Sequence, residues 1–238
     1  MVAMANELRA SVREAPATVP AMAAIGLFVL WATDQAGYPV TDWGPGGLLL
    51  LALLGIAFAA VGLRLRELPT PVKVALACLA AYTALSFLSI LWARVPADAW
   101  EGANRTLLYL AVFALFCSWR QRGATAALLL GAWTLAMIGL SVYVALHLKA
   151  ASSAELQRLL PSGRLVFPSG YANANAAQWL MAFWPALLLA RSRHLPWALR
   201  GLLAGGAVLL ALAALSLVRK RKDWRSKLAE AEAGESQP

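Results

Sequence analysis

Residues Trp43 to Leu63 read WGPGGLLLLALLGIAFAAVGL, and this stretch decides the fold class. No charged side chain interrupts it, and as an α-helix it extends over about 30 Å, which is the thickness of the hydrocarbon layer of a bilayer. Comparable apolar stretches recur along the chain between polar or Pro- and Gly-rich breaks. The sequence therefore predicts an all-α fold, a polytopic transmembrane helix bundle of about seven spans. The predicted spans are residues 18–33, 43–63, 72–92, 103–119, 124–148, 172–190 and 197–218.

The composition is typical of a membrane protein. Hydrophobic residues make up 61% of the chain and charged residues 14%, whereas soluble domains are about half apolar and about a quarter charged. The formal net charge is +9, which in a soluble protein would raise the question of nucleic-acid binding. Because the basic residues lie in short loops beside apolar stretches, we attribute them to membrane orientation and to anionic lipid head groups. The predicted partners are therefore membrane lipids and no nucleic acid.

Short tails flank the predicted membrane domain. We expect a cytoplasmic N-terminal tail over residues 1–17, a transmembrane helical domain over residues 18–218 and a charged C-terminal tail over residues 219–238. The basic residues of the loops favour a cytoplasmic N-terminus and seven crossings, but those of the C-terminal tail fit six crossings better. The two topologies stay open at this point.

The fourth predicted span, residues 103–119, is the weakest one. Its uninterrupted apolar core is short, so it becomes a span only if the helix begins near Gly102 or Ala103. Residues 97–105 could instead form an amphipathic interfacial helix, with Trp100 facing lipid and with Asp98, Glu101 and Arg105 facing water. Five tryptophans near predicted span ends are expected to lie at the level of the lipid head groups. They are Trp31, Trp43, Trp92, Trp119 and Trp197.

Residues 164–179, RLVFPSGYANANAAQW, are the most informative stretch for function, because they place polar side chains where a hydrophobic helix begins. Pro168 and Gly170 predict a turn, and Ser169 or Asn173 is predicted to cap the helix that follows.

Three of the polar side chains, Tyr171, Asn175 and Gln178, are spaced so that they share one face of the predicted helix. One interpretation is a pocket at the membrane surface, where the helix N-terminus and the carboxamides hold a phosphate or a sugar near Arg164. The other is a helix start whose amides join neighbouring helices. Both interpretations stay open.

Arg105 is predicted to begin a span on the same side of the membrane as Arg164 in the seven-crossing topology. Two guanidiniums on one face suit a pyrophosphate, because each planar fork binds oxygens bidentately and stays charged. The simpler alternative is an arginine that reaches toward the interface from a helix end. The candidate substrate-binding residues are Arg105, Arg164, Tyr171, Asn173, Asn175 and Gln178.

Other residues that often carry chemistry give weaker signals. Cys78 and Cys117 lie in apolar stretches, where a thiol behaves as a small hydrophobe, so we predict neither a disulfide framework nor a metal site. His147 and His194 are predicted to have structural roles, and no catalytic residue is assigned. Gly201 and Gly205 have a spacing that occurs where membrane helices pack closely.

Three stretches resemble the first half of the O-antigen ligase and polymerase superfamily. They are the Leu-Ser, Trp-Ala and Pro elements of residues 85–96, Arg105 with Leu108-Tyr109, and GYANANAA at residues 170–177. The resemblance covers roughly residues 25–216. It implies a multi-pass protein of the bacterial cytoplasmic (inner) membrane that handles a polyprenyl-pyrophosphate-linked glycan at the outer face. If the protein is active, the implied reaction is glycosyl transfer from that carrier, with no cofactor.

The chain also departs from the pattern of this superfamily. Family members continue through further spans and a large outer loop, so this chain is expected to be truncated relative to them. Whether the protein is active alone therefore stays open. One alternative is a non-catalytic half that assembles with a second membrane polypeptide. The principal alternative is a small multi-span transporter or transporter subunit, which intramembrane amides would also suit.

Overall fold

The computed structural model describes residues 16–61, 68–117, 119, 121–161 and 164–215. In these ranges every regular element is a helix, which confirms the predicted all-α class. The predicted tails lie outside the described residues, apart from residues 16 and 17. The chain divides into two compact units, Met1–Leu27 with Val40–Leu129 and Phe28–Pro39 with Leu130–Pro238.

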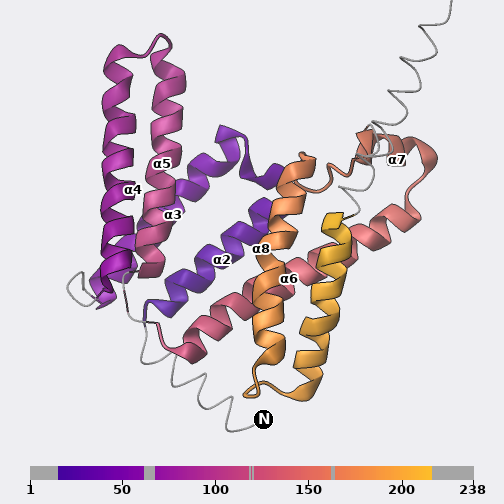
Figure 1. The fold of residues 1–238 in the computed structure, drawn as a ribbon. Coiled ribbons are helices and arrows are strands. Elements are labelled where there is room, and N and C mark those ends of the chain that lie inside the picture. Colours follow the sequence, from indigo (N-terminus) through magenta and orange to yellow (C-terminus); the bar gives the residue numbers. More distant parts are fainter. Residues whose placement is uncertain (1–15, 62–67, 118, 120, 162–163, 216–238) are drawn as a thin grey trace, which may run out of the picture. The chain divides into compact units, whose positions relative to one another are not determined.

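The first unit is built around an antiparallel pair of helices, α4 (Thr70–Leu88) and α5 (Pro96–Cys117), which lie side by side along their length (Figure 1). Pro69 and Pro96 suit the starts of these helices. The first N–H groups of a helix have no acceptor within it, so the N–H that proline lacks costs no hydrogen bond there. The short 3₁₀ helix η3 (Ser89–Trp92) extends α4 toward the connecting turn. Helix α3 (Val40–Val61) packs on α5, and the first half of α2 (Thr18–Thr33) completes the unit.

The second unit contains most of α6 (Gly123–Ala150), the short α7 (Ser153–Leu159), α8 (Ala172–Arg191) and the helix Trp197–Leu215. The 3₁₀ helix η1 (Gln35–Gly37) also belongs to it. Helix α7 is a feature that we did not predict. Its N-cap is Ser152, whose side chain accepts a hydrogen bond from the backbone N–H of Glu155 at 3.3 Å. A serine followed by a glutamate three residues later is a helix-start signal that was present in the sequence.

Four helices in the described residues are long and apolar enough to cross a membrane, which indicates a membrane protein but does not confirm seven spans. Helix α2 has the predicted bounds, but its 16 residues extend over only about 24 Å. Helices α5 and α8 form where spans were predicted, yet polar side chains in their first halves lower their hydropathy. The four candidate spans are Val40–Ala60, Thr70–Trp92, Gly123–Ala150 and Trp197–Leu215.

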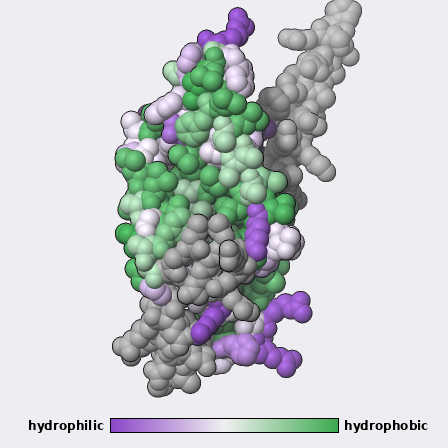
Figure 2. Space-filling model, turned by 90° about the vertical axis from the view of Figure 1, so that its left-hand side faces the viewer, coloured by the Kyte–Doolittle hydropathy of each residue, from purple (hydrophilic) through white to green (hydrophobic). Residues whose placement is uncertain are grey.

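The surface over α4 is the clearest sign of a lipid environment. Almost none of this helix is buried in the protein, and apolar side chains dominate the face of the molecule seen in Figure 2. Its large exposed side chains include Val74, Tyr82, Leu85 and Leu88. An apolar surface of this kind is stable in lipid and is rare on soluble monomers.

The structure corrects two predictions about helix ends and packing. Trp43 and Trp119 were expected at the head groups, but both are buried inside the protein, while Trp92 and Trp197 are exposed. A hydropathy pattern finds the end of an apolar stretch and does not show whether the indole there turns toward lipid or toward a neighbouring helix.

The spacing of Gly201 and Gly205, a weak packing signal, does not mark the close helix approach in the described residues. At Gly201 and Gly205 an added Cβ meets nothing within 4 Å among the described residues. At Gly206 an added Cβ would lie 2.7 Å from Cγ1 of Ile138 on α6 and closer still to Cδ1. The close helix approach is therefore at Gly206, and a spacing rule alone could not choose between adjacent glycines.

Candidate functional site

The candidate residues fall into the two units of the chain. Arg105 lies on α5 of the first unit, and the other five lie in or next to the loop of residues 164–171, which we call the α8 loop. Because Arg105 and Arg164 belong to different units, their predicted pairing stays a prediction.

Asn175 holds the α8 loop in place. Its side chain is completely buried, and its Nδ2 donates hydrogen bonds to the backbone oxygens of Leu165 (3.0 Å) and Phe167 (2.9 Å). Its Oδ1 accepts a longer hydrogen bond from the backbone N–H of Ser169 (3.4 Å). Both amide protons thus donate hydrogen bonds within the unit. These bonds offset the free-energy cost of burying a carboxamide in an apolar environment. Asn175 therefore has a structural role in this loop, and its predicted contact with substrate is untested.

The start of α8 differs from the predicted capping. The N-cap residue is Tyr171, which makes no side-chain cap hydrogen bond. The Ser169 hydroxyl instead donates to the backbone oxygen of Tyr171 (2.9 Å) and accepts from its N–H (3.4 Å). The predicted turn is confirmed, with Gly170 in the left-handed region at φ +73°.

Three polar residues in or next to the α8 loop are exposed. Arg164 and Tyr171 are exposed, and Nδ2 of the exposed Asn173 donates to the Tyr171 hydroxyl at 2.7 Å. Tyr171 is outside the helix, so it does not share a face with Asn175 and Gln178 as the spacing predicted. Gln178 is partly buried, and its Oε1 has no hydrogen-bond partner among the described residues.

An aromatic cluster that we did not predict packs against the α8 loop. His147, in the last turn of α6, lies 5.1 Å from the Phe167 ring and 5.9 Å from the Tyr143 ring, measured between centroids. Nε2 of His147 is 3.3 Å from Oε1 of Glu155 on α7. The predicted structural role of His147 fits these contacts, since they connect α6, α7 and the loop. The spacing of Tyr143 and His147, one helical turn apart, was the available signal.

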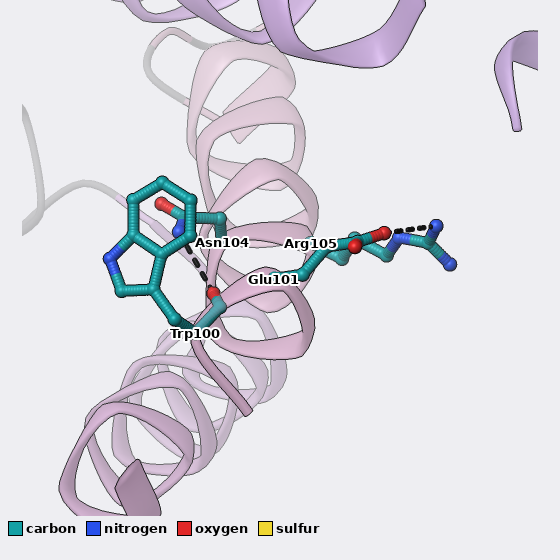
Figure 3. A network of polar contacts seen from close by, with 4 residues as sticks. All are labelled: Trp100, Glu101, Asn104 and Arg105. Atoms are coloured by element: carbon teal, nitrogen blue, oxygen red, sulfur yellow. Dashed lines mark hydrogen bonds and ion pairs between the residues drawn. The ribbon is translucent and has the colours of Figure 1, made fainter. Parts of the chain in front are cut away.

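Arg105 belongs to a polar cluster in the first half of α5. One of its terminal nitrogens, Nη2, lies 2.7 Å from Oε1 of Glu101 in the preceding turn, and both side chains are about one-third exposed. Figure 3 shows Glu101 and Arg105 on one side of the helix and Trp100 and Asn104 on another. The Asn104 side chain donates to the backbone oxygen of Trp100 at 2.8 Å.

A tryptophan from α3 lies beneath the guanidinium of Arg105. The guanidinium carbon, Cζ, is 5.8 Å from the centroid of the Trp43 ring, a distance at which cation–π attraction operates. Arg105 is thus held by a carboxylate and an indole. Glu101 could have been found from its spacing of four residues, whereas the contact with Trp43 depends on tertiary packing.

The chemistry available in these groups is anion and polar-ligand binding. Arginine forks bind phosphate oxygens, and exposed tyrosine and asparagine side chains offer a donor, an acceptor and an aromatic face. Within the described residues no group of three or more metal-binding side chains is close enough to hold an ion. No protein-family model matches the chain, and neither a curated protein nor a solved structure shows significant similarity to it.

Proposed function

We propose that this chain is a bacterial inner-membrane protein of cell-envelope polysaccharide assembly that binds a polyprenyl-pyrophosphate-linked glycan. The proposal rests on the motif resemblance described above and on the geometry of the α8 loop. One observation carries the geometric part: the buried Asn175 side chain fixes the loop, while Arg164, Tyr171 and Asn173 are exposed. A fixed loop binds a ligand without a large cost of ordering its backbone.

The exposed residues suit the two parts of such a ligand. The Arg164 guanidinium can bind pyrophosphate oxygens with two N–H groups, which a lysine ammonium does not reproduce. The hydrogen-bonded pair of Tyr171 and Asn173 offers hydroxyl and amide groups to a sugar. No glycosyl-transfer step is assigned to a residue, so binding is the function proposed.

The proposal includes a topology in which α5 crosses the membrane beside α4. The Thr83 hydroxyl donates to the backbone oxygen of Thr106 at 3.3 Å, so these two residues lie at the same level of the antiparallel pair. From that level, α4 with η3 extends about 14 Å to Trp92, and α5 extends about 15 Å to Pro96. In the opposite direction the lengths are about 20 Å for α4 and about 16 Å for α5. The candidate span α4 and its partner α5 are thus of similar extent, which supports the proposed topology in which both cross.

The test of function is a binding measurement on the purified full chain in lipid nanodiscs. We expect a short-chain polyprenyl pyrophosphate to bind more tightly than the corresponding monophosphate. Arg164→Ala should weaken binding by about tenfold, the effect expected for losing one charge-assisted contact. Arg164→Lys should weaken it less, because the charge remains.

Arg158→Ala is the matched control. Arg158 is an exposed arginine on α7 of the same unit, and it is not among the candidate residues. Its substitution should leave binding within about twofold of wild type, the scale of a distant surface charge. The proposal is lost if the wild-type chain shows no affinity for polyprenyl pyrophosphate, or if Arg164→Ala and Arg158→Ala have the same effect.

A further inference from the structure

The Glu101–Arg105 pair has the geometry of an occupied anion site. Oε1 of Glu101 lies 2.7 Å from Nη2 of Arg105, at the distance of a charge-assisted hydrogen bond. A phosphate oxygen binds a guanidinium through the same N–H groups. The carboxylate therefore stands where an oxygen of an incoming phosphate would bind.

The surroundings of Arg105 explain why an internal anion is needed. The guanidinium lies over the buried Trp43 ring, and the next residue, Thr106, is buried against α4. An arginine that is only one-third exposed in such surroundings is costly unless a negative charge is close. Glu101 supplies such a charge from the preceding turn.

The exposure of Glu101 allows its side chain to move away from Arg105. Its side chain is 39% exposed, so it can swing to the head-group side without being buried elsewhere. A pyrophosphate carries more charge and more acceptor oxygens than one carboxylate, so it can replace Glu101 at the guanidinium.

We infer that Glu101 acts as an internal competitor at Arg105, and that a membrane-associated pyrophosphate binds there by displacing it. This inference deepens the proposed function, on which it rests for the identity of the ligand. Glu101 then lowers the affinity of the site for every phosphate ligand by the same factor, because a ligand binds only the fraction of the protein in which Glu101 has left Arg105.

The experiment removes the competing charge and measures phosphate binding by the full chain in nanodiscs of neutral lipid. The probes are a short-chain polyprenyl pyrophosphate, inorganic pyrophosphate and phosphatidylglycerol. Glu101→Gln should tighten binding of the polyprenyl pyrophosphate and of inorganic pyrophosphate by about fivefold, because the ligand no longer has to break the Glu101–Arg105 ion pair. This pair is partly buried, so it is stronger than exposed ion pairs, which contribute little free energy. Glu101→Asp keeps the charge but shortens the reach, so it should act in the same direction and serves if Glu101→Gln folds poorly.

Two controls separate this mechanism from a general change in charge. Asp98→Asn removes one negative charge from the exposed first turn of the same helix and should change binding less than twofold. In an Arg105→Ala background, Glu101→Gln should have no effect, because the residue that both anions share is gone.

The outcomes distinguish the inference from the proposed function. If wild type binds polyprenyl pyrophosphate but Glu101→Gln leaves the affinity unchanged or weakens it, Glu101 positions Arg105 and the inference is overturned while the function stands. If Glu101→Gln strengthens only inorganic pyrophosphate, the internal competitor is supported and the lipid-linked ligand is lost. If phosphatidylglycerol binds wild type as tightly as the pyrophosphates do and is strengthened by the same factor, the preference for pyrophosphate is overturned. No binding of any probe by any variant overturns both.

Discussion

Replacement of Asn175 by alanine should release the α8 loop. The substitution removes two good hydrogen bonds, to the backbone oxygens of Leu165 and Phe167, and one longer one from Ser169. A net hydrogen bond contributes about 0.5–1.5 kcal/mol in proteins, and interhelical bonds in membranes average about 0.6 kcal/mol. Counting only the two short bonds, we expect the free energy of unfolding to fall by about 1–3 kcal/mol.

The assay is thermal or denaturant unfolding of the full chain in detergent, combined with amide hydrogen exchange of the α8 loop. The loop amides should exchange faster in Asn175→Ala, while amides in the middle of α4 should not change. Asn173→Ala is the matched control, because its exposed side chain makes one hydrogen bond among the described residues, to the Tyr171 hydroxyl. It should cost less than about 0.5 kcal/mol, the usual range for a surface substitution. Equal stability and equal exchange in the two variants would refute the structural role assigned to Asn175.

Two further predictions concern glycines with defined surroundings. Gly37→Ala should destabilise the protein by at least about 1–2 kcal/mol in unfolding experiments, because φ is +62° and an added Cβ would lie 2.7 Å from Cγ of Trp31. Gly206→Ala should cost about 1–3 kcal/mol by overpacking against Ile138. Gly205→Ala, where nothing lies within 4 Å of the added Cβ, should be neutral or stabilising by up to about 1 kcal/mol. The same melting assay checks all three, and equal melting temperatures for Gly206→Ala and Gly205→Ala would contradict the packing described here.

Several helix starts could be predicted from the sequence because a residue that disfavours helix stands just before the apolar stretch. Pro69 before α4 and the glycine and proline before α3 are examples. What hydropathy could not resolve was where α5 begins. Its first half carries Asp98, Glu101 and Arg105. A hydropathy pattern counts each of these charged residues separately against a membrane span. In the structure two of them form an ion pair, so the cost of their charges is partly offset.

The candidate site was predictable only at the level of a region. The polar residues before α8 do form one loop, but the sequence could not separate the residues that hold the loop from those that face outward. Asn173 and Asn175 are chemically identical and two positions apart, yet one is exposed and the other is fully buried. The difference comes from the path of the backbone at residues 165–169, where the oxygens of Leu165 and Phe167 lie within reach of Asn175. Tertiary packing sets this backbone path, and the local sequence does not reveal it.

The proposed crossing of α5 can be tested with the two native cysteines. Helix α5 runs opposite to α4, so Cys117 lies near the level of Lys73, at the end of α4 remote from Arg94, whereas Cys78 lies within the apolar stretch. If α5 crosses, a membrane-impermeant thiol reagent should label Cys117 from the side of Lys73, which is the cytoplasmic side in the seven-crossing topology, and should leave Cys78 unlabelled from both sides. Inverted and right-side-out vesicles give the two directions of labelling, and Cys117→Ser identifies the reactive thiol. If the segment only dips into the membrane, it returns to the side of Arg94, and labelling of Cys117 from that side would contradict the pairing of α4 and α5 as two spans of equal extent.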